Sequence, residues 1–180
     1  DALSTTMRSS FANQGQICLC GSRIFIERSI YEKFKTAFVD KVKNTLVSFP
    51  ADPKAKLGAI VSESHMEKIL SYIQLAKEEG GTILAGGERV YLEGEYKGGY
   101  YLKPTIIEGL AYNCRVNQEE IFGPVVTITP FDTEEEALMM ANSTQYGLAA
   151  TVWTTNLKKA HRLADNLQSG IVWINSWLVR

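Results

Sequence analysis

The stretch from Phe11 to Cys18, FANQGQIC, combines residue types that could carry out bond-making chemistry. Apolar residues at helical spacing precede it and predict a helix that runs into a small polar turn, where Gly15 lets the backbone bend sharply. A cysteine after such a turn has free backbone N–H groups beside it, which lower the pKa of a thiol and stabilise an oxyanion on a carbonyl that the thiolate attacks. Cys18 is therefore a candidate nucleophile, although a free cysteine is usually a small buried hydrophobic residue.

Three blocks of the sequence, in this order, resemble the motifs of one family. The first is Phe11-x-Asn13-x-Gly15-Gln16-x-Cys18, followed by Ser22-Arg23 and an apolar strand. The second is Glu119-Glu120-Ile121-Phe122-Gly123-Pro124, and the third is Tyr146-Gly147-Leu148-Ala149-Ala150. They are similar to the nucleophile motif, the cofactor-side motif and a third typical segment of the NAD(P)-dependent aldehyde dehydrogenases.

The resemblance implies a covalent oxidation of an aldehyde. Cys18 would add to the aldehyde carbonyl to give a thiohemiacetal, whose hydride passes to the nicotinamide, and water would release the acid from the resulting thioester. Glu120 would accept hydroxyls of the nicotinamide ribose, and Phe122 would pack near the nicotinamide. The structural alternatives are a Glu120 carboxylate that satisfies nearby backbone groups and a Phe122 side chain in the core. The cofactor would be NAD, with NADP not excluded.

The resemblance also implies that parts of the enzyme lie outside this chain. The family's general-base glutamate, its oxyanion-hole asparagine and its Rossmann-like cofactor domain precede the nucleophile motif, and no Gly-x-Gly-x-x-Gly follows a strand here. We expect residues 1–180 to form one nucleophile-bearing catalytic domain, truncated at both ends and inactive by itself. The full-length enzyme would be a homo-oligomer, a dimer or a tetramer.

The last residues bear on the substrate. Residues 175–180, NSWLVR, lie where the family places a substrate-pocket loop, and they resemble the ending of the 2-aminomuconate and 2-hydroxymuconate semialdehyde dehydrogenases. Arg180 could clamp a substrate carboxylate through two parallel hydrogen bonds, or it could be a solvated arginine. Ser176 belongs to the same loop, and Trp177 could form a wall of the pocket or be buried for structural reasons. The alternative substrates are neutral aliphatic, aromatic or betaine-type aldehydes, with Arg180 pointing away.

Two other functional classes remain open. A non-catalytic domain that keeps the fold would be favoured if Cys18 were buried and unreactive. A cysteine hydrolase would need His65 or His161 beside Cys18. No metal site is expected, because the two histidines are far apart in the sequence and no Cys/His spacing suits zinc. Cys20 and Cys114 are not candidate nucleophiles.

Composition limits the partners. With a net charge of -1, the chain has no basic field for nucleic acid, and it has neither a signal sequence nor an apolar run long enough to span a bilayer. Three cysteines, an odd number without the density of a disulfide framework, fit a reducing compartment. We therefore expect a cytoplasmic protein whose partner is a small aldehyde.

Strand and helix patterns alternate, which predicts an α/β fold with a largely parallel sheet flanked by helices. After the first helix, Ser29 is expected to cap a helix that buries Ile30, Phe34, Phe38, Val42 and Leu46. The glycines of residues 88–101 are compatible with a long hairpin or a surface excursion, but a plain connecting loop is the favoured interpretation. The other expected helices are 62–79, started by Ser62 or Ser64, one that begins at Thr133, and 156–167. The expected strands are 23–26, 82–85, 105–107, 125–129, 148–153 and 171–175.

Overall fold

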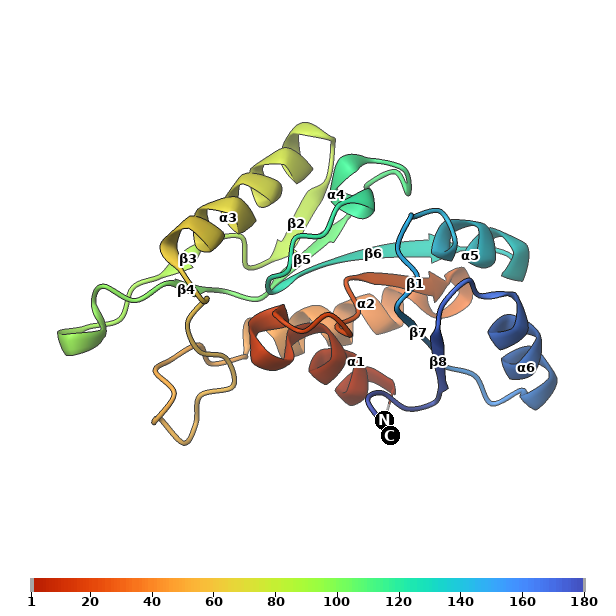
Figure 1. Cartoon of the computed structure of the whole chain (residues 1–180), viewed down its shortest axis with the longest axis horizontal. Helices are drawn as coiled ribbons and strands as arrows, with labels where there is room; N and C mark the ends of the chain where they lie inside the picture. Colours follow the sequence, from red (N-terminus) through yellow and green to blue (C-terminus); the bar gives the residue numbers. More distant parts are fainter. Residues whose placement is uncertain (1, 180) are drawn as a thin grey trace.

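A four-stranded sheet between two layers of helices forms the centre of the protein (Figure 1), whose computed structural model describes residues 2–179. The strand order is β1-β6-β5-β2, with β1 at Arg23–Glu27, β6 at Val125–Phe131, β5 at Thr105–Glu108 and β2 at Thr82–Ala85. The first three strands are parallel, and β2 pairs antiparallel to β5. The sheet is therefore mostly parallel but mixed, with an antiparallel strand at one edge.

Two helices cover one face of this sheet, α1 at Ala2–Phe11 and α2 at Arg28–Lys43 (Figure 1). Phe38 of α2 is fully buried, and it stacks near Phe11 with 6.1 Å between the ring centroids. Burial of such a side chain stabilises the fold by roughly 1.5–3 kcal/mol. The strands add side chains to the same apolar cluster, namely Ile26, Ala85, Ile106, Val126 and Ile128.

The opposite face packs against α3 at Glu63–Glu78 and the short α4 at Arg115–Gln118. Successive strand side chains point to opposite faces, so Ile107 and Val125 lie in this second cluster beside Ile69 of α3. The segment that carries Cys18 follows α1 on one face, whereas α3 lies on the other.

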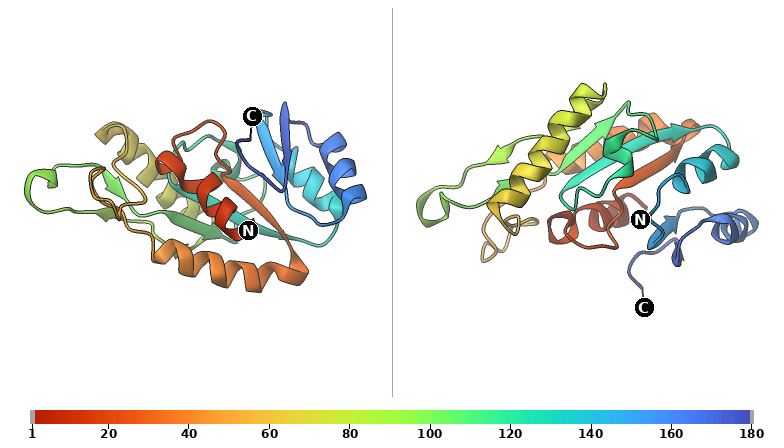
Figure 2. Two further views of the ribbon diagram at one scale, coloured as in Figure 1. Left: turned by 90° about the horizontal axis from the view of Figure 1, so that it is seen from below. Right: turned by 45° about the horizontal axis from the view of Figure 1, so that its top comes forward.

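Smaller elements surround this sheet (Figure 2). The strands β7 at Ala149–Val152 and β8 at Ile171–Ile174 form a separate parallel pair, joined by α6 at Leu157–Asn166. The remaining elements are α5 (Glu134–Ala141), β3 (Arg89–Val90), β4 (Tyr101–Leu102), η1 (Ala12–Gly15) and η2 (Gly94–Tyr96). Strands β3 and β4 pair antiparallel, so the favoured interpretation of residues 88–101 as a plain connecting loop is wrong, and the segment is a hairpin. Among residues 2–179, no helix combines the length and apolar composition needed to cross a bilayer.

The predicted helix starts are confirmed where a side chain caps the first turn. Ser62 accepts a hydrogen bond from the backbone N–H of His65 at 3.3 Å, and Thr133 caps α5 in the same way. The predicted start of α2 is wrong, because the helix begins at Arg28 and the Ser29 hydroxyl donates to the carboxylate of Glu27.

The predicted core of α2 is also wrong at its two ends. Ile30 is 53% exposed, because the buried stripe of the helix passes through the neighbouring Tyr31. Leu46 is 44% exposed, because α2 ends at Lys43 and no longer holds that residue over the sheet. Phe38 and Val42 are buried as predicted.

Candidate functional site

Cys18 lies at the surface in a tight turn that follows α1. The backbone is left-handed at Asn13 (φ 49°) and Gln14 (φ 58°), and the next turn closes through a 2.9 Å hydrogen bond from the Cys20 N–H to the Ile17 carbonyl. The Cys18 side chain is exposed, and among the described hydrogen bonds its backbone N–H has no acceptor. A thiol and an available N–H donor therefore meet at one residue, which is the geometry that covalent attack on a carbonyl requires.

Two glutamines of the motif fix this turn to a segment 45 residues away in the sequence. The Gln14 amide donates to the carbonyl of Ala59 at 3.1 Å, and the Gln16 side-chain oxygen accepts from the N–H of Val61 at 3.1 Å. Ala59 and Val61 lie outside the helices and strands, so their backbone groups need other hydrogen-bond partners, which the side-chain amides of Gln14 and Gln16 provide. The polar residues of the motif thus hold the Cys18 turn in place and leave the thiol free.

The other two cysteines differ from Cys18 in their surroundings. Burial raises the pKa of the Cys20 thiol to about 11, and its sulfur lies 3.8 Å from the carbonyl of Ala12. Burial also raises the pKa of Cys114. Since the thiolate is the nucleophile, a raised pKa disfavours the reactive form of both thiols.

The first two motif blocks touch through their glycines. Gly15 has φ +70°, and a Cβ built on it would lie 2.1 Å from the carbonyl oxygen of Gly123. Gly123 in turn packs on α3, where a Cβ would lie 2.5 Å from the side chain of Ile69. Only glycine permits these approaches, so the Cys18 segment and the 119–124 segment lie against each other, backbone to backbone.

Glu120 and Phe122 both remain open to a ligand. Glu120 is exposed, and within residues 2–179 its carboxylate makes no hydrogen bond or ion pair, so it does not satisfy nearby backbone groups. Phe122 is half-buried and left-handed, with φ 58°. Its carbonyl oxygen lies 2.7 Å from Nε2 of His65. A strained non-glycine backbone of this kind persists only where its surroundings enforce it, and such residues cluster at functional sites.

The predicted substrate loop meets the Cys18 turn through Trp177. The Trp177 side chain is 4% exposed, its indole N–H donates to the Leu19 carbonyl at 2.9 Å, and the Arg8 guanidinium lies 5.5 Å from its ring centroid. This burial matches the structural alternative for Trp177. The Ser176 hydroxyl donates to the Ile174 carbonyl at 3.2 Å. Arg180, the predicted carboxylate anchor, lies outside the described residues.

The histidines occupy different environments. His65 is half-buried on α3, where its ring bonds the Phe122 carbonyl, and His161 is exposed on α6. No hydrogen bond of the described chain joins Cys18 to either histidine, so the pair that a cysteine hydrolase needs is not formed there. The hydrogen bond between His65 and Phe122 is not predicted from the sequence. The two residues are 57 positions apart, and the sequence shows His65 only as a polar residue on a helix.

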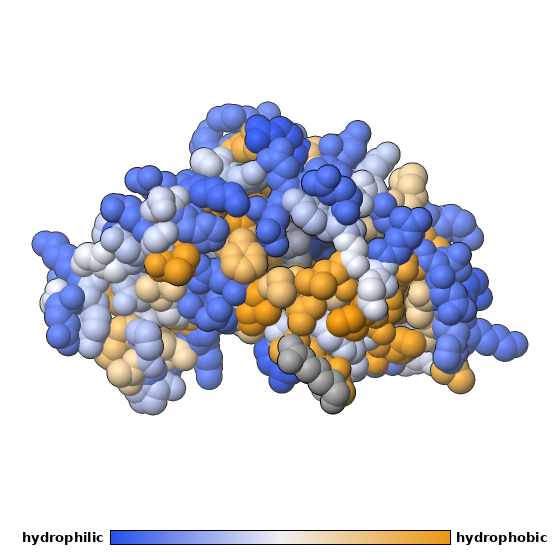
Figure 3. All heavy atoms as spheres, viewed as in Figure 1, coloured by the Kyte–Doolittle hydropathy of each residue, from blue (hydrophilic) through white to orange (hydrophobic). Residues whose placement is uncertain are grey.

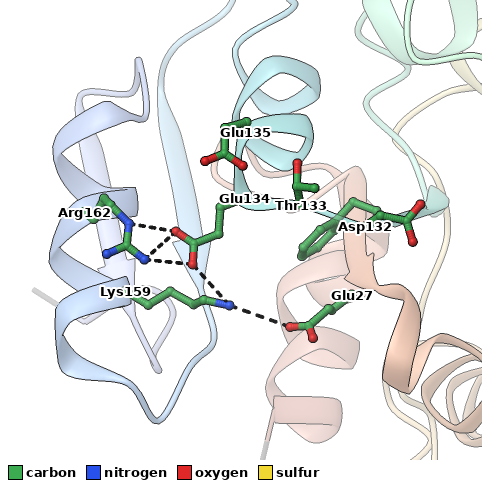
Figure 4. A pocket seen from close by; sticks show the side chains of 8 residues that line it. Glu27, Asp132, Thr133, Glu134, Glu135, Lys159 and Arg162 are labelled. Carbon is green, nitrogen blue, oxygen red and sulfur yellow. Dashed lines mark hydrogen bonds and ion pairs between the residues drawn. The ribbon is translucent and has the colours of Figure 1, made fainter.

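Apolar side chains gather on the face shown in Figure 3, over the region of α1, β7 and β8. A different opening, of about 420 Å³, lies between the start of α5 and α6 (Figure 4). Part of its lining is ion-paired: Arg162 meets Glu134 at 2.7 Å, and Lys159 bridges Glu134 and Glu27 at 3.3 and 3.8 Å. These ion pairs link α6 to the start of α5 and to the end of β1.

Comparison with known proteins gives one family. Residues 1–180 match the model of the aldehyde dehydrogenase family. The chain is 48% identical over 182 residues to the 2-aminomuconic semialdehyde dehydrogenase of Bos taurus, which covers 100% of the chain and 37% of that protein. It is 47% identical over 179 residues to the 2-hydroxymuconic semialdehyde dehydrogenase of Pseudomonas sp. (strain CF600), which covers 99% of the chain and 37% of that protein.

The fold agrees with this result. The structure of the NAD+ complex of an aldehyde dehydrogenase from Bacillus cereus superposes with a TM-score of 0.94 at 40% identity, over 99% of the chain and 35% of that protein. The chain thus spans little more than a third of the length of the proteins that it matches. The family model covers the whole chain, and the three motif blocks lie within it; the chain belongs to the aldehyde dehydrogenase family.

Proposed function

We propose that residues 1–180 form the nucleophile-bearing domain of a longer NAD-dependent aldehyde dehydrogenase that oxidises an aldehyde to a carboxylic acid. The observation that supports the proposal is the contact of Gly15 with Gly123, because it joins the turn that carries the exposed Cys18 to the segment that carries Glu120 and Phe122. A thiol that holds a reacting carbon next to a cofactor ring gains much of its rate from proximity.

Cys18 carries the chemical steps. Its thiolate forms a C–S bond to the aldehyde carbon, and the carbonyl electron pair moves onto oxygen, where the free Cys18 N–H stabilises the oxyanion. Loss of hydride from that carbon leaves a thioester. Water then adds to the thioester carbonyl, the C–S bond breaks, and the acid leaves with Cys18 regenerated.

The residues of the second motif fit a nicotinamide cofactor. The unpaired carboxylate of Glu120 can accept hydrogen bonds from ribose hydroxyls, and the half-buried ring of Phe122 can pack on an aromatic ring. NAD, when bound, supplies the hydride acceptor. The match to a solved NAD+ complex of the family supports NAD as the cofactor.

The proposed substrate class is a muconic semialdehyde, which carries a carboxylate. Support comes from the names of the relatives at 47–48% identity and from an arginine at position 180, whose guanidinium suits a carboxylate. Neutral aliphatic, aromatic or betaine-type aldehydes are the alternative substrates.

The test uses the full-length enzyme and follows NAD reduction with 2-aminomuconic or 2-hydroxymuconic semialdehyde and, in parallel, with benzaldehyde. Cys18→Ser should remove activity by at least about a thousandfold, since a serine hydroxyl is a far weaker nucleophile, while Cys20→Ser as a matched control should remain active. Full activity in Cys18→Ser would refute the mechanism.

Substrate class is tested separately with Arg180→Ala. The variant should lose about tenfold or more in kcat/KM for the semialdehyde, the size expected for one lost charge-assisted contact, and little for benzaldehyde. Equal values for the variant and wild type with the semialdehyde would favour the neutral-aldehyde alternative.

A further inference from the structure

One face of α3 holds the segment that carries Glu120 and Phe122. His65, Lys68 and Tyr72 follow one another at spacings of three and four, so they lie along the same side of the helix. The ring Nε2 of His65 is 2.7 Å from the Phe122 carbonyl, the Lys68 ammonium donates to the Glu120 carbonyl at 2.9 Å, and the Tyr72 hydroxyl donates to the carboxylate of Glu119 at 2.5 Å.

These bonds act on groups that no regular element fixes. The segment from 119 to 124 belongs to neither a helix nor a strand, and Phe122 has the left-handed conformation that a bulky residue rarely adopts. The His65 ring also lies edge-on to the Phe122 ring, with 6.2 Å between centroids. His65 therefore contacts both the backbone carbonyl and the aromatic ring of Phe122, and it fixes where each of them points.

The remaining contacts of the segment leave the Glu120 side chain free. Lys68 bonds the backbone of Glu120 and not its carboxylate. The carboxylate of Glu119 is occupied instead, because Arg115 donates to it twice, at 2.8 and 3.1 Å, beside the Tyr72 hydroxyl. Arg115 and Tyr72 together lower the pKa of Glu119 to about 2, so this carboxylate stays charged and paired near neutral pH.

We propose that His65 is a positioning residue for the cofactor: by donating from Nε2–H to the Phe122 carbonyl, it orients Phe122 and Glu120 toward a nicotinamide nucleotide bound beside Cys18. The inference rests on the proposed function. Lys68 and Tyr72 anchor the same segment at its other end. The alternative is that the imidazole merely fills space between α3 and the segment, in which case side-chain volume matters and the donor does not.

The test compares two substitutions of His65 in the full-length enzyme. His65→Gln keeps an N–H donor, His65→Leu keeps the bulk without a donor, and His161→Leu is the matched control on an exposed helix position. The readouts are the dissociation constant of NAD, measured by titration without aldehyde, and the rate at which iodoacetamide modifies Cys18 in the absence of NAD.

We expect His65→Leu to weaken NAD binding about tenfold, as for one lost hydrogen bond that also frees a strained carbonyl, and His65→Gln to remain within about threefold of wild type. His161→Leu should bind NAD as wild type does, and Cys18 modification should stay within about twofold in every variant. Wild-type affinity in His65→Leu, or equal weakening in both His65 variants, would overturn the proposal.

Tyr72→Phe provides a second measurement if His65→Leu does not fold. It removes only the hydroxyl that bonds Glu119, and it should weaken NAD binding about threefold without changing Cys18 modification. An unchanged NAD affinity in Tyr72→Phe would count against α3 as the positioning element. Failure of the proposed function is a separate outcome, because wild-type enzyme would then neither bind nor reduce NAD.

Discussion

Replacing Gly15 with alanine tests the contact on which the site depends. The residue has φ +70°, and the added methyl carbon would lie 2.1 Å from the Gly123 carbonyl oxygen and 2.5 Å from the Gly123 carbonyl carbon. Both neighbours are backbone atoms, so no side-chain rotation relieves the clash. The Cys18 turn and the 119–124 segment have to separate by about 1 Å to reach ordinary contact distance.

The expected cost has two parts. Alanine in the left-handed region costs roughly 1–2 kcal/mol relative to glycine. Forcing a methyl group into a filled contact costs a further 1–3 kcal/mol or so, and the sum is about 2–5 kcal/mol of unfolding free energy. A displacement of about 1 Å between the thiol and the cofactor side should also lower kcat/KM by about a hundredfold.

Gly94→Ala is the matched control, because Gly94 has φ +66° and a Cβ there would meet nothing within 4 Å. Only the backbone cost of roughly 1–2 kcal/mol applies to it, and the enzyme should keep its activity. The assay is urea unfolding together with NAD reduction by the full-length protein. If Gly15→Ala loses no more stability or activity than Gly94→Ala, the two segments do not depend on this contact and the reasoning is refuted.

Three further predictions concern single groups. Burial raises the pKa of Cys20 to about 11 from an ordinary value of 9.0, so between these values the folded state retains a proton that the unfolded state loses. The unfolding free energy measured in urea should therefore fall between pH 9 and 11 in wild type but not in Cys20→Ala. Arg115 lowers the pKa of Glu119 from an ordinary 4.5 to about 2, so the stabilisation that this carboxylate gives the fold is complete above pH 4.5 and disappears toward pH 2. Acid unfolding of Glu119→Gln should lack this loss of stability between pH 4.5 and 2. Trp177→Phe leaves the Leu19 carbonyl without its donor and should lower the unfolding free energy by about 1–3 kcal/mol in urea titrations.

Local signals in the sequence were sufficient for much of the fold. Ser62 and Thr133 cap helices because their hydroxyls accept the backbone N–H group three positions ahead, an interaction contained within a few residues. The same holds for the strand of residues 82–85, which ends at the left-handed Gly86. The mixed sheet was not predicted, because β2 has the same residue types whether it pairs parallel or antiparallel with β5.

The sequence predictions are wrong where the apolar periodicity of a helix fits more than one buried face. The apolar positions of α2 allow more than one stripe, and the sheet selected the one through Tyr31, whose hydroxyl also reaches the Glu108 carboxylate at 2.9 Å. Ile30 is left outside that stripe. The hydrogen bond from the Gln14 side chain to the Ala59 carbonyl could not be predicted either, since a polar residue in a turn gives no sign of which distant backbone group it will bond.

The glycines explain why residues far apart in the sequence can form one site. Gly15 rests on Gly123, and Gly123 rests on Ile69 of the helix that also provides His65, so the nucleophile segment, the cofactor-side segment and α3 form a continuous stack. In the third motif, Gly147 accepts from the Gly170 N–H at 2.8 Å and so fixes the start of the β7–β8 pair. A methyl group at either contact of the stack would push apart the two segments that the chemistry needs together. The distance between the Cys18 turn and the 119–124 segment is therefore set by backbone contacts, which glycine at positions 15 and 123 permits because it has no side chain.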